Sequence, residues 1–255
     1  MVENVKKDFV EDKNVKGKIS VEDNFPFKKV DFVELNFVAK VDGRVFDTNI
    51  LDVAKNEGLK GKGLFKPLIV PLEEGFLLQG LYEFLLDKKP GKYSVVIPPE
   101  KAFGKKNVKL IQTLSLNVFK KQNLNPYPGM EVQINDSVGI VKNVGSGRVL
   151  VDFNHPFAGK TVVYEVDFLR VVDDPVRNLN ALTALVLKLP ENLYSITKNE
   201  DVLKLKVTLS ESEFPKSALE DFVKMASAMI KGVSKVEFEY GKVKVDSGVV
   251  KEKKD

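Results

Sequence analysis

The sequence has no cysteine and only one histidine, and these absences exclude several kinds of site. Without cysteine the chain forms no disulfide, no thiolate metal site and no cysteine nucleophile. A metal site usually needs several nitrogen or sulfur ligands, which His155 alone does not supply. We therefore expect no metal and no cofactor, and a structural role for His155 in its loop.

Arginine and long apolar runs are also scarce. Only four of the 40 basic residues are arginine, and 36 acidic residues leave a net charge of +4. Nucleic-acid recognition relies on the planar fork of arginine, so we expect solvated lysines and no nucleic-acid partner. There is no stretch of about 18 apolar residues and no apolar segment of the signal-peptide kind at the start. We expect no membrane span and a cytoplasmic location.

The chain is long enough for several domains. Its 255 residues, 43% of them hydrophobic and 30% charged, fit roughly two or three domains. Residues 1–24 are polar and predict an N-terminal arm, and residues 251–255 a charged tail. Asp173 and Asp174, followed by Pro175, end an apolar strand and predict a domain boundary.

The stretch Val41–Asn49 predicts a β-hairpin. Asp42-Gly43 favours the positive φ angles of a tight turn, and the returning strand ends on Phe46 and Asp47. In the preceding strand the apolar alternation slips between Phe32 and Leu35, which predicts a bulge or a register change.

Besides a short helix over Asp52–Asn56, two longer helices are predicted. Residues Phe76–Leu86 are apolar on more than one face, so this helix should be nearly enclosed. Residues 212–231 have an apolar stripe, with Pro215 in the first turn, and a strand is expected to follow from Val233. Leu179–Leu189 fits either a helix or a strand.

Three segments together resemble the FKBP-type prolyl isomerases: VDGRVFDTN (41–49), PLEEGFLLQGL (71–81) and VVIPPEKAFG (95–104). Seven short motifs follow the family's order over residues 27–173. The insertion that ends in NHPFAGK looks like the insert-in-flap domain of the SlyD-like branch. The part beyond Asp174 looks like the extra domain of the longer archaeal members.

The resemblance implies an α+β fold with an antiparallel, FKBP-like half-barrel sheet wrapped on one short helix. It places this isomerase domain at residues 25–104 and 159–173. A small β-rich chaperone domain would be inserted at residues 105–158, and an α+β domain would follow at residues 174–250.

The resemblance also assigns a prolyl pocket. The implied catalytic residues are Asp47, Phe46, Phe37, Phe103 and Tyr164. The implied substrate-binding residues are Leu68, Val70, Leu77, Leu78 and Leu81. Taken singly, Phe46, Leu78 and Leu81 fit a plain core better than a pocket, and only the joint pattern favours the pocket. Asp47 alone fits a turn or cap as well.

Two positions depart from the family's pattern. Leu81 stands where the pocket floor is often tryptophan, and Phe37 stands where the first aromatic is usually tyrosine. The hairpin is one residue shorter than usual, so Asn36 competes with Phe37 for that position. A drier and slower or less selective pocket is expected.

Such a pocket needs no nucleophile. Rotation about a peptide C–N bond meets a barrier of ~18–20 kcal/mol because resonance holds the bond planar. A dry apolar pocket removes the water that stabilises the polarised planar amide, and Asp47 can orient the twisted carbonyl.

The insertion carries apolar residues with two interpretations: the small domain's own core, or a surface that binds unfolded chains. A unit of roughly 55 residues has too little interior to hide them all, so we favour a shared role. The predicted chaperone surface consists of Leu110, Ile111, Leu114, Leu116, Val118, Phe119, Tyr127 and Met130.

We therefore predict a peptidyl-prolyl cis–trans isomerase with chaperone activity, acting on unfolded or partly folded proline-containing polypeptides. The alternative is a chaperone or binding module whose isomerase activity is weak or vestigial. The C-terminal unit is either self-contained or a dimerisation or client-holding module, and a homodimer is slightly favoured.

Overall fold

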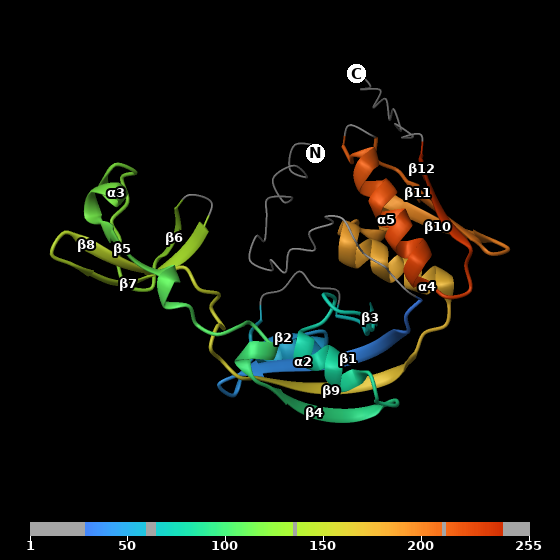
Figure 1. Cartoon of the computed structure of the whole chain (residues 1–255), viewed down its shortest axis with the longest axis horizontal. Coiled ribbons are helices and arrows are strands. Elements are labelled where there is room, and N and C mark those ends of the chain that lie inside the picture. Colours follow the sequence, from blue (N-terminus) through green and yellow to red (C-terminus); the bar gives the residue numbers. More distant parts are fainter. Residues whose placement is uncertain (1–28, 60–64, 135–136, 211–212, 242–255) are drawn as a thin grey trace, which may run out of the picture.

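The computed structural model describes residues 29–59, 65–134, 137–210 and 213–241 (Figure 1). They form a mixed α+β structure with three separate sheets, which confirms the predicted fold class at this level. The predicted N-terminal arm and charged tail lie outside the described residues. No helix of the described part has the length and apolarity needed to cross a membrane.

The largest sheet has five antiparallel strands in the order β2-β1-β9-β4, with β3 also paired to β1. Its strands are β1 (Phe32–Val41), β2 (Arg44–Thr48), β3 (Leu68–Pro71), β4 (Gly91–Ile97) and β9 (Val162–Val171). We call it the large sheet. Three short helices belong to the same region: α1 (Leu51–Asn56), α2 (Gln79–Leu85) and the 3-10 turn η1 (Pro99–Lys101).

Two predictions about β1 are confirmed. Asp42 and Gly43 have φ angles of 52° and 77°, so the turn into β2 has the left-handed backbone that this dipeptide favours. The pairing of β1 with β9 shifts register between Glu34 and Leu35. This irregularity explains the slip in apolar alternation seen in the sequence.

Helix α2 is shorter than expected. It begins at Gln79, because Gly75, at a φ of 90°, turns the chain and Glu74 bridges to Leu77. The enclosed helix itself is present, since Leu81 and Leu85 are buried. Gly80 permits its close approach to β4: a Cβ there would lie 2.5 Å from Cγ2 of Ile97.

The insertion forms a sheet of its own, which we call the insert sheet. Its strands are β5 (Ile111–Ser115), β6 (Glu131–Ile134), β7 (Ser137–Gly145) and β8 (Arg148–Asp152). The order is β5-β8-β7-β6, with η2 (Val108–Leu110) before it and α3 (Leu116–Lys120) packed on it. Figure 1 shows the insert sheet projecting away from the rest of the chain on two adjacent connections.

Hydrogen bonds tie these two connections together. Gly159 N donates to Gly104 O at 2.8 Å. Further out, Asn107 N donates to Asn154 Oδ1 at 2.8 Å, and Asn154 Nδ2 donates to Asn107 O at 3.0 Å. The insert is therefore attached at a narrow neck.

The C-terminal unit comprises a three-stranded sheet and two main helices. Its elements are α4 (Pro175–Leu182), the π-helix η3 (Thr183–Leu187), the 3-10 turn η4 (Glu191–Leu193), β10 (Tyr194–Asn199), β11 (Val202–Val207), α5 (Lys216–Met229) and β12 (Lys235–Tyr240). Helix α4 begins at the predicted boundary, where the Asp174 carboxylate accepts from Val176 N at 2.9 Å. Strand β10 was not predicted, and β11 pairs with β12 in parallel. Pro215 lies just before α5, outside its first turn.

The C-terminal unit is continuous with the large sheet through a shared core. Val30, Phe32 and Val172 are buried together with residues of α4, β11 and α5. The ammonium of Lys29 donates to three carbonyls at the end of α5, at 2.6–3.1 Å. Glu34 of β1 pairs with Arg170 at 2.6 Å and with Arg177 of α4 at 2.7 Å.

Candidate active site

The predicted pocket residues gather on the face of the large sheet that packs against helix α2. One core cluster contains Val70, Leu81 and Tyr164, which are at most 9% exposed. The half-buried members packed on it include the remaining apolar pocket residues: Phe37, Phe46, Leu68, Leu77, Leu78 and Phe103. Residues from five distant segments therefore meet at one place.

Two aromatic pairs lie among the predicted pocket residues. On β1 and β9, the rings of Phe37 and Tyr164 have centroids 5.8 Å apart. The second pair packs on the same apolar cluster: Phe46, near the end of β2, meets Phe103 edge to face, at 6.0 Å and 71°. Phe37 lines a cavity together with Asp47, whereas Asn36 does not. The lining therefore favours Phe37 over Asn36 for the predicted pocket position.

Asp47 supplies the charged group. Asp47 is exposed to solvent on one side. Partial desolvation of its carboxyl by the packed side chains nonetheless raises its pKa, although a backbone hydrogen bond from Thr48 acts in the opposite direction. Burial, and then the negative charge of Asp47, raise the pKa of Tyr164. Tyr164 thus keeps its proton at neutral pH, and an acidic group and a phenol lie side by side in a largely apolar setting.

Comparisons with known proteins identify the family of this arrangement. The sequence profile of the FKBP-type peptidyl-prolyl cis-trans isomerases matches residues 25–121, and that of the FKBP26 IF domain matches residues 112–157. The short-type peptidyl-prolyl cis-trans isomerase of Methanocaldococcus jannaschii is 31% identical over 141 residues, which cover 54% of this chain and 90% of that protein. The chain belongs to the FKBP-type peptidyl-prolyl cis-trans isomerase family.

A SlyD-type relative and one solved structure also match parts of the chain. An FKBP-type peptidyl-prolyl cis-trans isomerase SlyD from Treponema pallidum is 32% identical over 101 residues, covering 36% of this chain and 54% of that protein. The match to the crystal structure of the three FKBP domains of wheat FKBP73 covers 60% of this chain and 43% of the wheat chain. The sequence identity is 21% and the TM-score is 0.29. The enzyme class of the chain is that of the FKBP isomerases.

Two further rings, absent from the predicted pocket residues, contact the aromatics of that pocket. The ring of His155 stacks on Phe103 at 4.5 Å and 8°, and Phe157 lies 4.6 Å from Phe46. Both come from the NHPFAGK run at the exit of the insert. The resemblance of this run to a family motif was the signal in the sequence that could have identified them. The insert thereby contributes to the pocket wall through its returning connection.

His155 is held as a neutral ring. Phe157 N donates to its Nδ1 at 3.1 Å, so the proton of the neutral imidazole is on Nε2. Burial lowers the pKa of His155. The predicted structural role fits this arrangement, because the ring supports Phe103.

A proton NMR titration checks this environment. Because His155 is the only histidine, one ring resonance reports its ionisation, and we expect a pKa below the ordinary value of about 6.5. Since the folded pKa is depressed, the folding stability that this neutral ring provides is present above the unfolded pKa and lost as pH falls through the folded value. His155→Gln should remove that part of the pH dependence; a titration at or above the ordinary value would contradict the burial.

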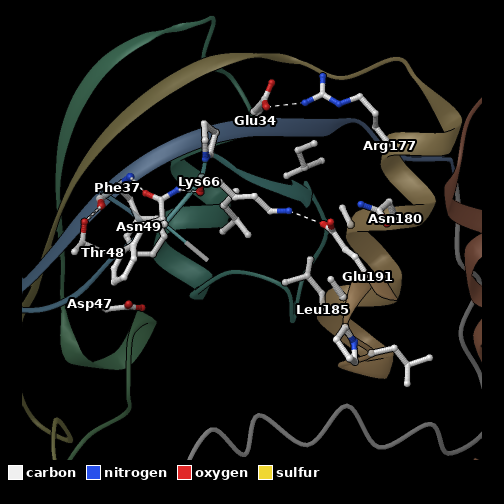
Figure 2. Close-up of a pocket in the computed structure, with 18 residues that line it drawn as sticks. Glu34, Phe37, Asp47, Thr48, Asn49, Lys66, Arg177, Asn180, Leu185 and Glu191 are labelled. Atoms are coloured by element: carbon white, nitrogen blue, oxygen red, sulfur yellow. Dashed lines mark hydrogen bonds and ion pairs between the residues drawn. The ribbon is translucent and has the colours of Figure 1, made fainter. Parts of the chain in front are cut away.

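Asn49 organises the edge of the site. Its Oδ1 accepts from Phe37 N at 2.8 Å, and its Nδ2 donates to the carbonyls of Leu35 and Lys66, each at 3.0 Å (Figure 2). Thr48 Oγ1 donates to Phe37 O at 2.6 Å. One amide thus fixes the backbone of Phe37 and the segment that leads into β3.

The predicted chaperone surface is only partly exposed. Phe119 is 1% exposed in the core of the insert, so its placement on that surface was wrong. Leu114, Leu116 and Met130 pack against the same core, and Ile111 is half-buried. The residues open to solvent are Leu110, Val118 and Tyr127, at 39%, 37% and 63%, together with Val108 at 78%.

Among the residues that the structure describes, no group of three His, Cys, Asp or Glu side chains is placed to hold an ion. The predicted site offers an apolar enclosure, with the carboxylate of Asp47 and the phenol of Tyr164 beside it.

Proposed function

We propose that the chain accelerates cis–trans isomerisation of X-Pro bonds in folding polypeptides, with the pocket of Phe37, Phe46, Leu81, Phe103 and Tyr164 as the catalytic site. The observation that supports this most strongly is the convergence of the apolar pocket residues in one cluster beside Asp47. Proline is apolar, and its tertiary amide has both isomers populated but slow to exchange.

The mechanism follows from enclosure. The proline ring packs between the two aromatic pairs and above Leu81, which is 2% exposed. Water that would stabilise the planar, polarised amide is excluded there, so the twisted amide loses less stabilisation than the planar one. The negative charge of Asp47 adds an electrostatic field that orients the carbonyl group next to the rotating C–N bond.

We further propose that the insert holds unfolded chains near this pocket. Val108, Leu110, Val118 and Tyr127 are exposed on it, and apolar side chains open to solvent give an unfolded chain apolar surface to cover. A client tethered there presents its prolines to the pocket at a raised local concentration. The insert thus acts as a holdase for the isomerase.

A second candidate is a chaperone whose isomerase pocket is weak. It is favoured by Leu81, an aliphatic floor that provides no aromatic face or N–H beneath the proline. Exchange between the cis and trans signals of a short proline peptide, followed by NMR with and without the full chain, tests the choice. Catalysed exchange supports the isomerase, whereas suppressed aggregation of an unfolded protein without it selects the second candidate.

The predicted homodimer through the C-terminal unit remains a proposal. The described part of that unit ends in strand β12, which pairs on one side with β11, and an unpaired strand edge is a common route to association. Sedimentation equilibrium of the full chain distinguishes a monomer from a dimer.

A further inference from the structure

We propose that the cleft between the prolyl pocket and helix α4–η3 binds an apolar side chain of the substrate segment that flanks the proline. This inference rests on the proposed isomerase function and adds a substrate subsite to it. The C-terminal unit would then select the sequence around the proline.

The cleft is large enough for such a side chain. It has a volume of about 520 Å³, which is within the range of ligand sites, roughly 300–1,000 Å³. Phe37, Asp47 and Leu68 line it from the large sheet, and Ala181, Ala184 and Leu185 line it from the C-terminal unit. Figure 2 shows these two walls on opposite sides of the space.

The cleft is continuous with the prolyl pocket. Phe37 and Leu185 line the cleft and also pack against the apolar cluster that contains Leu81 and Tyr164. Asp47 lines the cleft as well, and its charge acts on Tyr164 of the prolyl pocket. A chain whose proline occupies the pocket must therefore pass the cleft within a few residues. The occupant is then a neighbouring residue of the same substrate, without a separate ligand.

Apart from Asp47, the main polar side chains of the cleft already have partners within the chain. Lys66 pairs with Glu191, and Glu34 pairs with Arg177. The Oδ1 of Asn180 accepts from the Tyr194 hydroxyl at 2.5 Å, and Asn49 is bonded to backbone. A polar ligand would find few free partners at this lining, whereas an apolar side chain loses water against Phe37, Leu68 and Leu185.

The two walls of the cleft are held at a fixed distance, but the ion pair across its entrance can open. Glu34, 11% exposed, holds Arg177 of α4 against the large sheet, so the two walls keep their spacing. Across the mouth, Lys66 Nζ lies 2.5 Å from Glu191 Oε1, and these side chains are 52% and 54% exposed (Figure 2). Exposed pairs of this kind contribute little to stability, so an entering chain can displace it.

The backbone of the C-terminal wall is unusual at this place. After α4 the helix continues as a π-helix over Thr183–Leu187 and ends at Lys188, whose φ is 53°. Such wide turns are rare and recur at functional sites. The wide turn carries Ala184 and Leu185, two of the residues that line the cleft.

A peptide series tests the subsite by binding and by turnover. Each peptide carries one proline and either phenylalanine or glycine at one position, from three residues before to three residues after it. We expect phenylalanine at one of these positions to tighten Kd and raise kcat/KM about fivefold to tenfold, because it is buried in the cleft. No preference at any position would overturn the subsite.

Two variants locate the preference in the cleft. Ala184→Trp fills the space and Leu185→Asn makes its wall polar, so each should reduce the phenylalanine-to-glycine ratio to about one. Ser217→Trp, at an exposed position of α5, is the control and should keep the wild-type ratio. Unchanged ratios in both cleft variants, with wild-type unfolding temperatures, would overturn the inference.

The binding measurement separates the subsite from the proposed function. Peptide binding with a cleft-dependent preference but without catalysis would overturn the isomerase and keep the subsite. Catalysis without any preference would keep the isomerase and overturn the subsite. A chain that neither binds nor turns over the peptides would overturn both.

Discussion

Replacing Asp47 with alanine is expected to lower kcat/KM on a short proline peptide by about tenfold to a hundredfold. Each factor of ten corresponds to ~1.4 kcal/mol of lost transition-state stabilisation. The variant removes the charged group beside the pocket while leaving the apolar cluster intact. Phe46→Ala should also slow catalysis, because it opens the wall formed with Phe103 and Phe157.

Stability separates a catalytic role of Asp47 from a structural one. Desolvation raises the folded pKa of Asp47, so folding loses stability as pH rises through that pKa. At neutral pH Asp47→Ala should therefore unfold at the same or a slightly higher temperature than the wild type. Asp52→Ala, which removes another exposed carboxylate nearby in α1, is the matched control and should keep full activity. A wild-type rate for Asp47→Ala would refute the catalytic assignment.

Replacing the body of the insert is expected to affect protein substrates far more than peptides. Joining Asn107 to Asn154 through a short glycine-serine link removes residues 108–153 and uses the neck where these asparagines are hydrogen-bonded. Catalysis of a proline-limited refolding reaction should fall about tenfold or more, since tethering raises effective concentration by large factors. Peptide turnover should change less than about twofold.

The position of this link matters because His155 and Phe157 contact the pocket aromatics. A deletion over residues 105–158 would remove them and slow peptide turnover for a second reason. Val118→Ser with Tyr127→Ser in the intact chain is the companion variant, since it changes only exposed positions. Equal losses on peptides and on refolding proteins would argue against a capture role.

Local signals in the sequence were sufficient for much of the large sheet. The Asp42-Gly43 turn requires left-handed backbone, and the broken alternation before Leu35 coincides with a register shift. The pocket residues were identified through the spacing of family motifs, and the structure places the apolar ones in a single cluster. Such features depend on a few neighbouring residues, so a sequence can reveal them.

Other features depend on contacts between distant segments and could not be predicted. The apolar run that contains Phe119 is expected in a core and in an exposed groove alike. Phe119 is buried because it packs with Val132 and Val149, which are distant in the sequence. The cleft requires Leu185 to face Phe37 across more than a hundred residues of sequence. The parallel pairing of β11 with β12 likewise follows from the crossover through α5.

The pairing of β1 with β9 has a consequence for the order in which the chain folds during synthesis. The central strand of the large sheet, Phe32–Val41, cannot complete its hydrogen bonds until residues 162–171 have been made. All four strands of the insert sheet end by Asp152, and domains generally fold as units while the chain is still being synthesised. The insert can thus be complete on the ribosome before the pocket residues of the large sheet have come together.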